Sequence, residues 1–172
     1  MKKVLLLFLL ACVMAPVGAQ VYIGGSVSAW LDDNNGKETS TVSFLPELGF
    51  LLGERWAVGA VLGYSQRRYD GTTTSETFEF SPYARFTYYR TDLVGLFIDG
   101  TVSTYSSKSG SADRVATYSV GLKPGVSFDL SDRISLVAKF GFFGFRQYSD
   151  DNTGIGFNLN GNDLSLGLYY TF

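Results

Sequence analysis

The sequence contains no histidine, a single cysteine at position 12, and few charged residues, which make up 17% of its 172 residues. Without histidine, the chain cannot form a Ser-His-Asp triad, a histidine-ligated zinc site or a histidine general base. A single cysteine excludes an internal disulfide and a cysteine metal cluster. We therefore expect no catalytic residues, no metal site and no cofactor. Typical soluble domains carry about 25% charged residues, so the low charge needs a structural reason.

The start of the chain has the pattern of a secretory signal peptide. Lys2 and Lys3 precede an apolar run over residues 4–13, and Ala19 follows small residues that suit a cleavage site. The run is shorter than the ~20 residues that a transmembrane helix needs. The segment around Cys12 also resembles a lipoprotein-processing site, which stays open as the alternative. We expect Sec-type export, cleavage of residues 1–19 near Ala19, and one domain over residues 20–172.

The remainder of the chain alternates apolar and small or polar residues with a period of two, as strands with one apolar face do. Eight segments show this pattern, and no segment after Gln20 shows a sustained helical period. The segments are residues 21–30, 41–51, 56–67, 78–89, 96–103, 116–128, 134–142 and 164–172. The sequence therefore predicts an all-β protein with eight strands. Pro46, Pro82 and Pro124 lie inside these segments, where we expect local bulges because proline removes a ladder hydrogen bond.

The connections between the segments alternate in length. Short ones lie near residues 52–55, 90–93 and 129–133, and long polar ones near 32–40, 69–76, 106–113 and 148–162. Short turns at one end and longer loops at the other are typical of outer-membrane barrels. The pattern predicts an antiparallel up-and-down barrel.

The size of the side chains on each face indicates which face points outward. A soluble barrel points its apolar face inward, and a membrane barrel points it outward. The interior of eight strands is just wide enough to be filled by side chains. The polar face carries many glycines and serines and fits such an interior, whereas the large aliphatic and aromatic residues of the other face would overfill it. We expect the apolar face to contact lipid, which makes the fold an eight-stranded transmembrane β-barrel.

The C-terminus resembles the assembly signal of outer-membrane barrels: a polar residue, a glycine, an aromatic residue and a terminal phenylalanine at the spacing of Ser165, Gly167, Tyr170 and Phe172. The whole of residues 20–172 resembles the outer membrane protein β-barrel domain family, whose members are small and porin-like. The resemblance implies the cell outer membrane of a diderm bacterium as the location. It implies outer-membrane lipid, lipopolysaccharide, the barrel-assembly machinery and periplasmic chaperones as partners.

Several charged residues share the face that points into the lumen. They are Glu47, Arg67, Glu79, Arg85, Asp99, Lys123 and Lys139. Five of them lie about five to eight residues from a short turn, so a rise of about 3.3 Å per residue places them in one layer. These five are Glu47, Arg85, Asp99, Lys123 and Lys139. Because an unpaired buried charge is costly, we expect a network of ion pairs that plugs the lumen.

The residue types narrow the function without naming a ligand. The enzymes known among small outer-membrane barrels use a histidine, which this chain lacks, so we expect no enzyme. Without the signal peptide the chain has 12 basic and 16 acidic residues, a net charge of −4, and no basic cluster to bind nucleic acid. The first hypothesis is a structural or surface-interaction role with a plugged lumen. The alternatives are a narrow pore for ions or small solutes, and a soluble periplasmic barrel that binds a ligand inside.

Overall fold

The computed structural model describes residues 19–34, 37–110, 113–149, 152–158 and 164–172. Within these residues, no helix is long and apolar enough to cross a membrane. The predicted signal peptide falls almost wholly outside the described residues. The strands are β1 (Gln20–Asn34), β2 (Lys37–Leu52), β3 (Trp56–Tyr69), β4 (Thr72–Arg90), β5 (Val94–Ser109), β6 (Val115–Asp129), β7 (Ile134–Lys139), β8 (Phe142–Ser149), β9 (Asn152–Asn158) and β10 (Ser165–Thr171).

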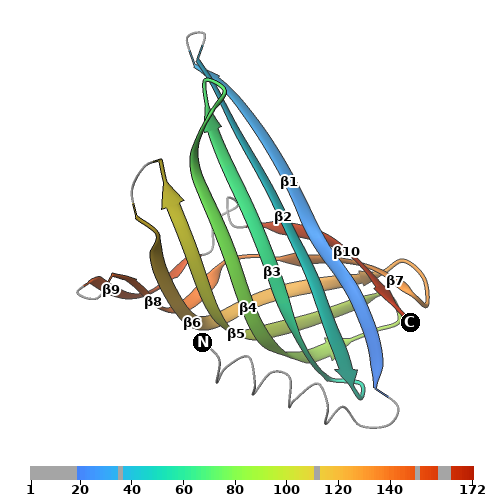
Figure 1. Cartoon of the computed structure of the whole chain (residues 1–172). Helices are drawn as coiled ribbons and strands as arrows, with labels where there is room; N and C mark the ends of the chain where they lie inside the picture. Colours follow the sequence, from blue (N-terminus) through green and yellow to red (C-terminus); the bar gives the residue numbers. More distant parts are fainter. Residues whose placement is uncertain (1–18, 35–36, 111–112, 150–151, 159–163) are drawn as a thin grey trace.

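Eight of the strands close into an antiparallel ring (Figure 1). Neighbouring strands pair in chain order from β1 to β6, β6 pairs with β7, β7 with β10, and β10 returns to β1. The predicted eight-stranded antiparallel up-and-down barrel is confirmed. Because the sheet closes on itself, no strand is left, within the ring, with the unpaired edge that an open sheet would have.

The strands β8 and β9 form a hairpin that leaves the ring. β8 continues β7 after a break at Phe140 and Gly141 and pairs with β6, and β9 pairs with β8. In Figure 1 this hairpin projects to the left of the ring, on the side away from the C-terminus. The predicted seventh strand therefore extends beyond residue 142, to Ser149.

The polar connections that the sequence predicts as long loops are mostly paired strand. β3 and β4 are joined by Asp70 and Gly71 alone, both with positive φ, as a tight hairpin turn requires. β1 and β2 stay in register as far as the pair Asn34 and Lys37. The expected long loops at residues 32–40 and 69–76 are therefore corrected to hairpin extensions, because the polar residues of these stretches stay paired with the neighbouring strand beyond the ring. The four strands of these two hairpins rise together in Figure 1.

The two faces of the strands follow the predicted parity. Large apolar side chains of the outer face are exposed, for example Val27 (68%), Leu48 (50%) and Leu62 (59%). Small and polar side chains of the other face, such as Ser103 and Ser119, are buried. The soluble ligand-binding barrel, which would need its apolar face inside, does not fit this arrangement.

The prolines interrupt pairing without moving the register, except at Pro124. The β2–β3 ladder lacks bridges at Leu45 and Pro46, and the β4–β5 ladder lacks them at Ser81 and Pro82, yet each register is the same on both sides. Pro124 lies opposite the break between β7 and β8, where three residues face two. The expected bulge is thus found beside one of the three prolines.

That bulge changes which way one aromatic points. The alternation over residues 134–142 predicts Phe142 on the outer face. The structure places Phe142 in the lining of a lumen cavity instead. The extra residue is accommodated at Gly141, whose φ is 71°, and it shifts the parity of the chain by one position.

Candidate functional site in the barrel lumen

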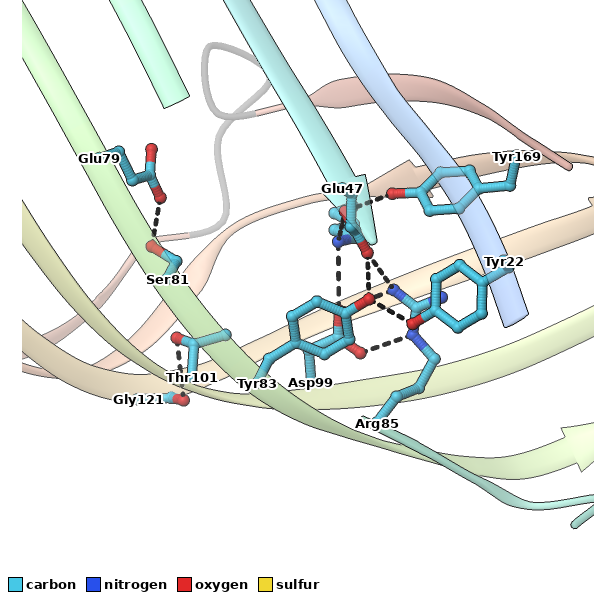
Figure 2. Close-up of polar contacts among 11 residues, drawn as sticks. Tyr22, Glu47, Glu79, Ser81, Tyr83, Arg85, Asp99, Thr101, Gly121 and Tyr169 are labelled. Atoms are coloured by element: carbon cyan, nitrogen blue, oxygen red, sulfur yellow. Dashed lines mark hydrogen bonds and ion pairs between the residues drawn. The ribbon is translucent and has the colours of Figure 1, made fainter. Parts of the chain in front are cut away.

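Seven polar or charged side chains meet across the middle of the ring and are called the lumen cluster here (Figure 2). They come from β1, β2, β4, β5, β7 and β10, so six of the eight ring strands contribute. The members are Tyr22, Glu47, Tyr83, Arg85, Asp99, Lys139 and Tyr169.

Glu47 on β2 is the centre of the cluster. Its Oε2 accepts hydrogen bonds from Lys139 Nζ at 2.7 Å and from Tyr169 Oη at 2.6 Å. Its Oε1 accepts a hydrogen bond from the Tyr83 hydroxyl and lies 3.5 Å from Arg85 Nη2. With only 4% of its surface exposed, Glu47 is a buried carboxylate whose charge is matched by cations on two other strands.

Arg85 and Asp99 form the second half of the cluster. The guanidinium donates two parallel hydrogen bonds to the carboxylate, Nε to Oδ1 at 2.7 Å and Nη2 to Oδ2 at 2.9 Å. This two-point geometry is the strong form of an arginine–carboxylate pair. The same guanidinium lies 3.9 Å from the ring centre of Phe97, within the range of a cation–π contact. Lys139 Nζ lies 3.4 Å from Asp99 Oδ2 and so links the two halves.

The lumen cluster balances its own charge. Arg85 and Lys139 supply two cations, and Glu47 and Asp99 supply two carboxylates. All four side chains are largely hidden from solvent, with exposed fractions from 1% to 14%. The cost of removing these four charges from water is offset because each has an oppositely charged partner on another strand.

The remaining predicted lumen charges lie outside the cluster. Lys123 is opposite Asp99 in the β5–β6 register, yet it makes no ion pair with any residue that the structure describes. Glu79 lies nearer the long hairpins and accepts a hydrogen bond from Ser81 Oγ at 2.5 Å. Arg67 is exposed near the end of β3, at a register shift in the β3–β4 ladder. Of the five residues expected in one layer, four meet and Lys123 does not join them.

Four buried aromatic residues of the lumen were not predicted. They are Tyr22, Tyr83, Phe97 and Tyr169, with exposed fractions from 1% to 6%. Their spacing could have predicted this orientation. Each lies two or four residues from a small or charged residue of the inner face, and residues separated by an even number share a face of the strand. Tyr83, for example, lies midway between Ser81 and Arg85.

A glycine on the neighbouring strand faces each of these aromatic rings. The register partners are Tyr22 and Gly49, Tyr169 and Gly24, Tyr83 and Gly59, and Phe97 and Gly125. A Cβ atom at Gly24 would lie 2.5 Å from the Tyr169 ring, which is closer than side-chain contacts allow. The inner-face glycines therefore give these rings the space to lie flat against the barrel wall.

Cavities lie on both sides of the lumen cluster. On the side of the long hairpins, a cavity of about 210 Å³ is lined by Glu47, Asp99 and Lys139 below and by Glu79 and Tyr105 above. On the side of the short turns, a cavity of about 80 Å³ is lined by cluster residues and by residues near the turns. Among the described residues, no group of three acidic, histidine or cysteine side chains is placed to hold a metal ion.

The residues of the predicted assembly signal lie on β10 or at its end. Tyr170 and Phe172 are on the outer face, with their ring centres 5.0 Å apart in an edge-to-face arrangement. Ser165 and Gly167 face the lumen cavity. The backbone N–H of Phe172 donates a 2.9 Å hydrogen bond to the Val21 carbonyl, so the last residue is tied to the first strand.

The family model described as outer membrane protein beta-barrel domain matches residues 4–172 of the chain. No curated protein matches the sequence at a significant level.

Two solved structures are similar to this chain. Neisserial surface protein A is similar at 14% identity and a TM-score of 0.55, over 90% of this chain and 97% of that one. The outer membrane protein Ail of Yersinia pestis, solved in a phospholipid bilayer nanodisc, is similar at 13% identity and a TM-score of 0.48, over 90% of this chain and 99% of that one. At such low identity, the likeness to Neisserial surface protein A is a likeness of fold.

Proposed function

The chain belongs to the outer membrane protein β-barrel domain family, and on that premise we propose that it is a non-enzymatic outer-membrane barrel with a closed lumen. Its role is then structural, or depends on interactions at the surface, because a closed lumen leaves the outer wall and the hairpins as the working parts. The absence of histidine from the whole sequence supports the non-enzymatic part of the proposal.

The observation that supports a closed lumen best is the lumen cluster. It joins six strands across the interior by hydrogen bonds between buried groups, and it separates the two cavities. An ion that passes would have to displace paired charges. Leaving one partner of such a pair buried and uncompensated costs roughly 3–5 kcal/mol.

The barrel-assembly machinery and periplasmic chaperones belong to the same proposal, as partners during export. Lipopolysaccharide and outer-membrane lipid are the proposed surroundings of the outer face. The exposed Tyr170 and Phe172 support this part, since both are displayed on the outer face of the strand that closes the ring.

A narrow pore is the second candidate. One observation favours it: Lys139 Nζ is within 3.4 Å of Asp99 and 2.7 Å from Glu47, so it already shares two carboxylates. A side chain with two nearby partners can move between them with little change in energy. Such an exchange would open a path between the two cavities.

Planar-bilayer recording separates the two candidates. The purified full chain is expected to give no steady unitary current. A Glu47→Ala and Lys139→Ala double variant keeps the net charge but empties the centre of the cluster, so it is expected to conduct. The matched control is Glu38→Ala with Lys108→Ala, two exposed residues near the hairpin ends. Stable unitary steps in the unaltered protein would favour the pore and overturn the closed lumen.

A further inference from the structure

The sheet is closed on the side of the short turns and ends in two free edges on the side of the long hairpins. β10 begins at Ser165 and pairs with β1 from Tyr22 to Gly25. Beyond that point, residues 26–34 of β1 pair with β2 on one side and with no described strand on the other. β9 is in the same position, because β8 is its one partner among the described strands.

The free edge of β1 lies at the depth of the membrane. Its border on the side of the short turns is near Val21, whose carbonyl accepts the hydrogen bond from the terminal aromatic residue, Phe172. A strand crosses the apolar core of the membrane in about 9–11 residues, so β1 stays within this core as far as about Leu31. Val27 and Leu31 are largely exposed, as lipid-facing side chains are.

The free edge of β9 lies at a similar depth. Two rows of exposed apolar side chains run across the outer face from β6 over β8 to β9. The rows are Leu122, Phe143 and Phe157, and Val120, Phe145 and Ile155. Because the β6 members of these rows belong to the lipid face of the ring, that face continues onto β9 and stops at its edge.

The sequence of β9 does nothing to protect this edge. Proteins usually protect a free edge with a charged residue, a proline or a bulge. Residues 153–157 contain no charge and no proline, and their register with β8 is regular. Open sheet edges do not occur in contact with lipid, where no water satisfies the backbone N–H and C=O groups. Each of the two edges is therefore a place for another strand at the same depth.

We propose that two copies of the chain pair side by side in the membrane, with β9 of each copy added to the free edge of β1 of the other. A two-fold axis along the membrane normal forms both contacts at once and keeps the two copies in the same orientation. The paired strands are antiparallel, because β9 runs towards the short turns and β1 runs away from them. The proposal rests on the membrane location of the barrel and not on a closed lumen.

The direction of the β8–β9 hairpin favours a second copy over the chain's own β1. In Figure 1 the hairpin projects to the left, whereas β1 lies on the right, and the two strands share no pairing. A Cβ atom at Gly156 would meet nothing within 4 Å, so no described residue covers this part of β9. Exchange of such an arm between identical chains is a low-cost route to a dimer.

The test is sedimentation equilibrium of the purified full chain in density-matched micelles, over a range of protein-to-detergent ratios. A reversible equilibrium between monomer and dimer is expected. Ile155→Lys puts a charge on the edge strand at both two-fold-related contacts, and lysine in such a place opposes pairing. The variant is expected to weaken the dimer about 10-fold or more, because two cross-strand contacts are lost.

The matched control is Val102→Lys. Val102 is an exposed residue of β5 that pairs with Val120, so it lies in the same cross-strand row as Ile155 but inside the sheet. This variant is expected to dimerise like the unaltered chain. The amide spectrum of each variant shows whether the barrel is folded, and Ile155→Gln replaces Ile155→Lys if the latter does not fold.

Hydrogen exchange gives a second measurement. Alternate N–H groups of an edge strand point away from its neighbour, so every second amide of residues 26–31 and 153–157 is expected to be protected in the dimer and to exchange rapidly in the monomer. A monomer at every ratio would overturn the proposal, and protected β9 amides in that monomer would mean that β9 pairs within its own chain. Equal dimerisation of the folded Ile155 variant, or an equal loss in the Val102 control, would also overturn it. Bilayer recording tests the closed lumen separately.

Discussion

Phe97 shows how single residues set the shape of the lumen. It is 1% exposed, lies against Gly125 of the neighbouring strand and carries the Arg85 guanidinium on its face. The ring can occupy this place only because Gly125 has no side chain. The arginine is in turn held at the height where it meets Asp99. A residue without a side chain therefore helps to position a charge on another strand.

The first prediction concerns this glycine. In Gly125→Ala the new Cβ would lie 2.5 Å from Phe97 Cε2 and 2.8 Å from the Ala138 carbonyl oxygen, which is backbone and cannot move freely. Overpacking of this kind costs about 1–3 kcal/mol. We expect a lower urea midpoint for the unfolding of the barrel in micelles.

Gly100→Ala is the control for this substitution. The nearest atoms to its Cβ would be 3.8 and 3.9 Å away, which is ordinary contact. Its urea midpoint should equal that of the unaltered protein. Equal midpoints for the two alanine variants would mean that the ring does not need the space at Gly125.

At the scale of the elements, the break between β7 and β8 decides what lines the hairpin side of the lumen. The bulge at Gly141 adds one residue opposite Pro124, and it turns Phe142 inward. Because the side chains of a strand alternate, one extra residue exchanges the two faces for everything that follows. Arg146 reaches the lumen cavity for this reason, since it lies on the same face as Phe142.

The second prediction tests the bulge. Gly141 has a φ of 71°, a left-handed conformation that costs other residues about 1–2 kcal/mol. Gly141→Ala should therefore lower the free energy of unfolding by about that amount, measured by urea titration in micelles. Gly156→Ala is the control, because its Cβ would meet nothing within 4 Å. A Gly141 variant as stable as this control would show that the bulge can relax without the left-handed residue.

At the scale of the whole molecule, β10 completes the ring. It pairs with β7 on one side and with β1 on the other, and Phe172 donates a backbone hydrogen bond to Val21. The tenth strand therefore joins the first strand of the barrel. Contacts between strands so distant in the chain form late, because closing a long loop has an entropic cost.

The third prediction separates assembly in the cell from folding itself. Phe172→Ala removes an exposed ring at the chain end, so refolding in micelles should be unchanged. If the C-terminus is the signal read by the assembly machinery, the variant should be several-fold depleted from the outer-membrane fraction. Phe128→Ala, also an exposed phenylalanine, is the control and should reach the membrane normally. Equal amounts of both variants in the membrane would contradict the proposed signal.

Most of the charged residues of the lumen cluster could be predicted from the sequence. The residues that the prediction misplaced or left out have identifiable physical causes. Parity places Glu47, Arg85, Asp99 and Lys139 on the inner face, and their distance from the turns places them at similar heights. The same reasoning included Lys123, which the structure leaves apart because Asp99 has two other partners. The aromatic members were missed because aromatic residues were expected on the lipid face, although the parity of Tyr83 already indicated the interior.

The sequence by itself determined the eight strands of the ring, the closed antiparallel barrel and the face that each ring strand turns outward. These properties follow from the alternation of apolar and polar residues with a period of two, which is a property of each strand's own sequence. Only the tertiary structure decided which inner charges meet, because the tilt and register of eight strands set the height of each side chain relative to the others. It also decided the reversed face after Gly141, and it left Lys123 above the lumen cluster without a described partner.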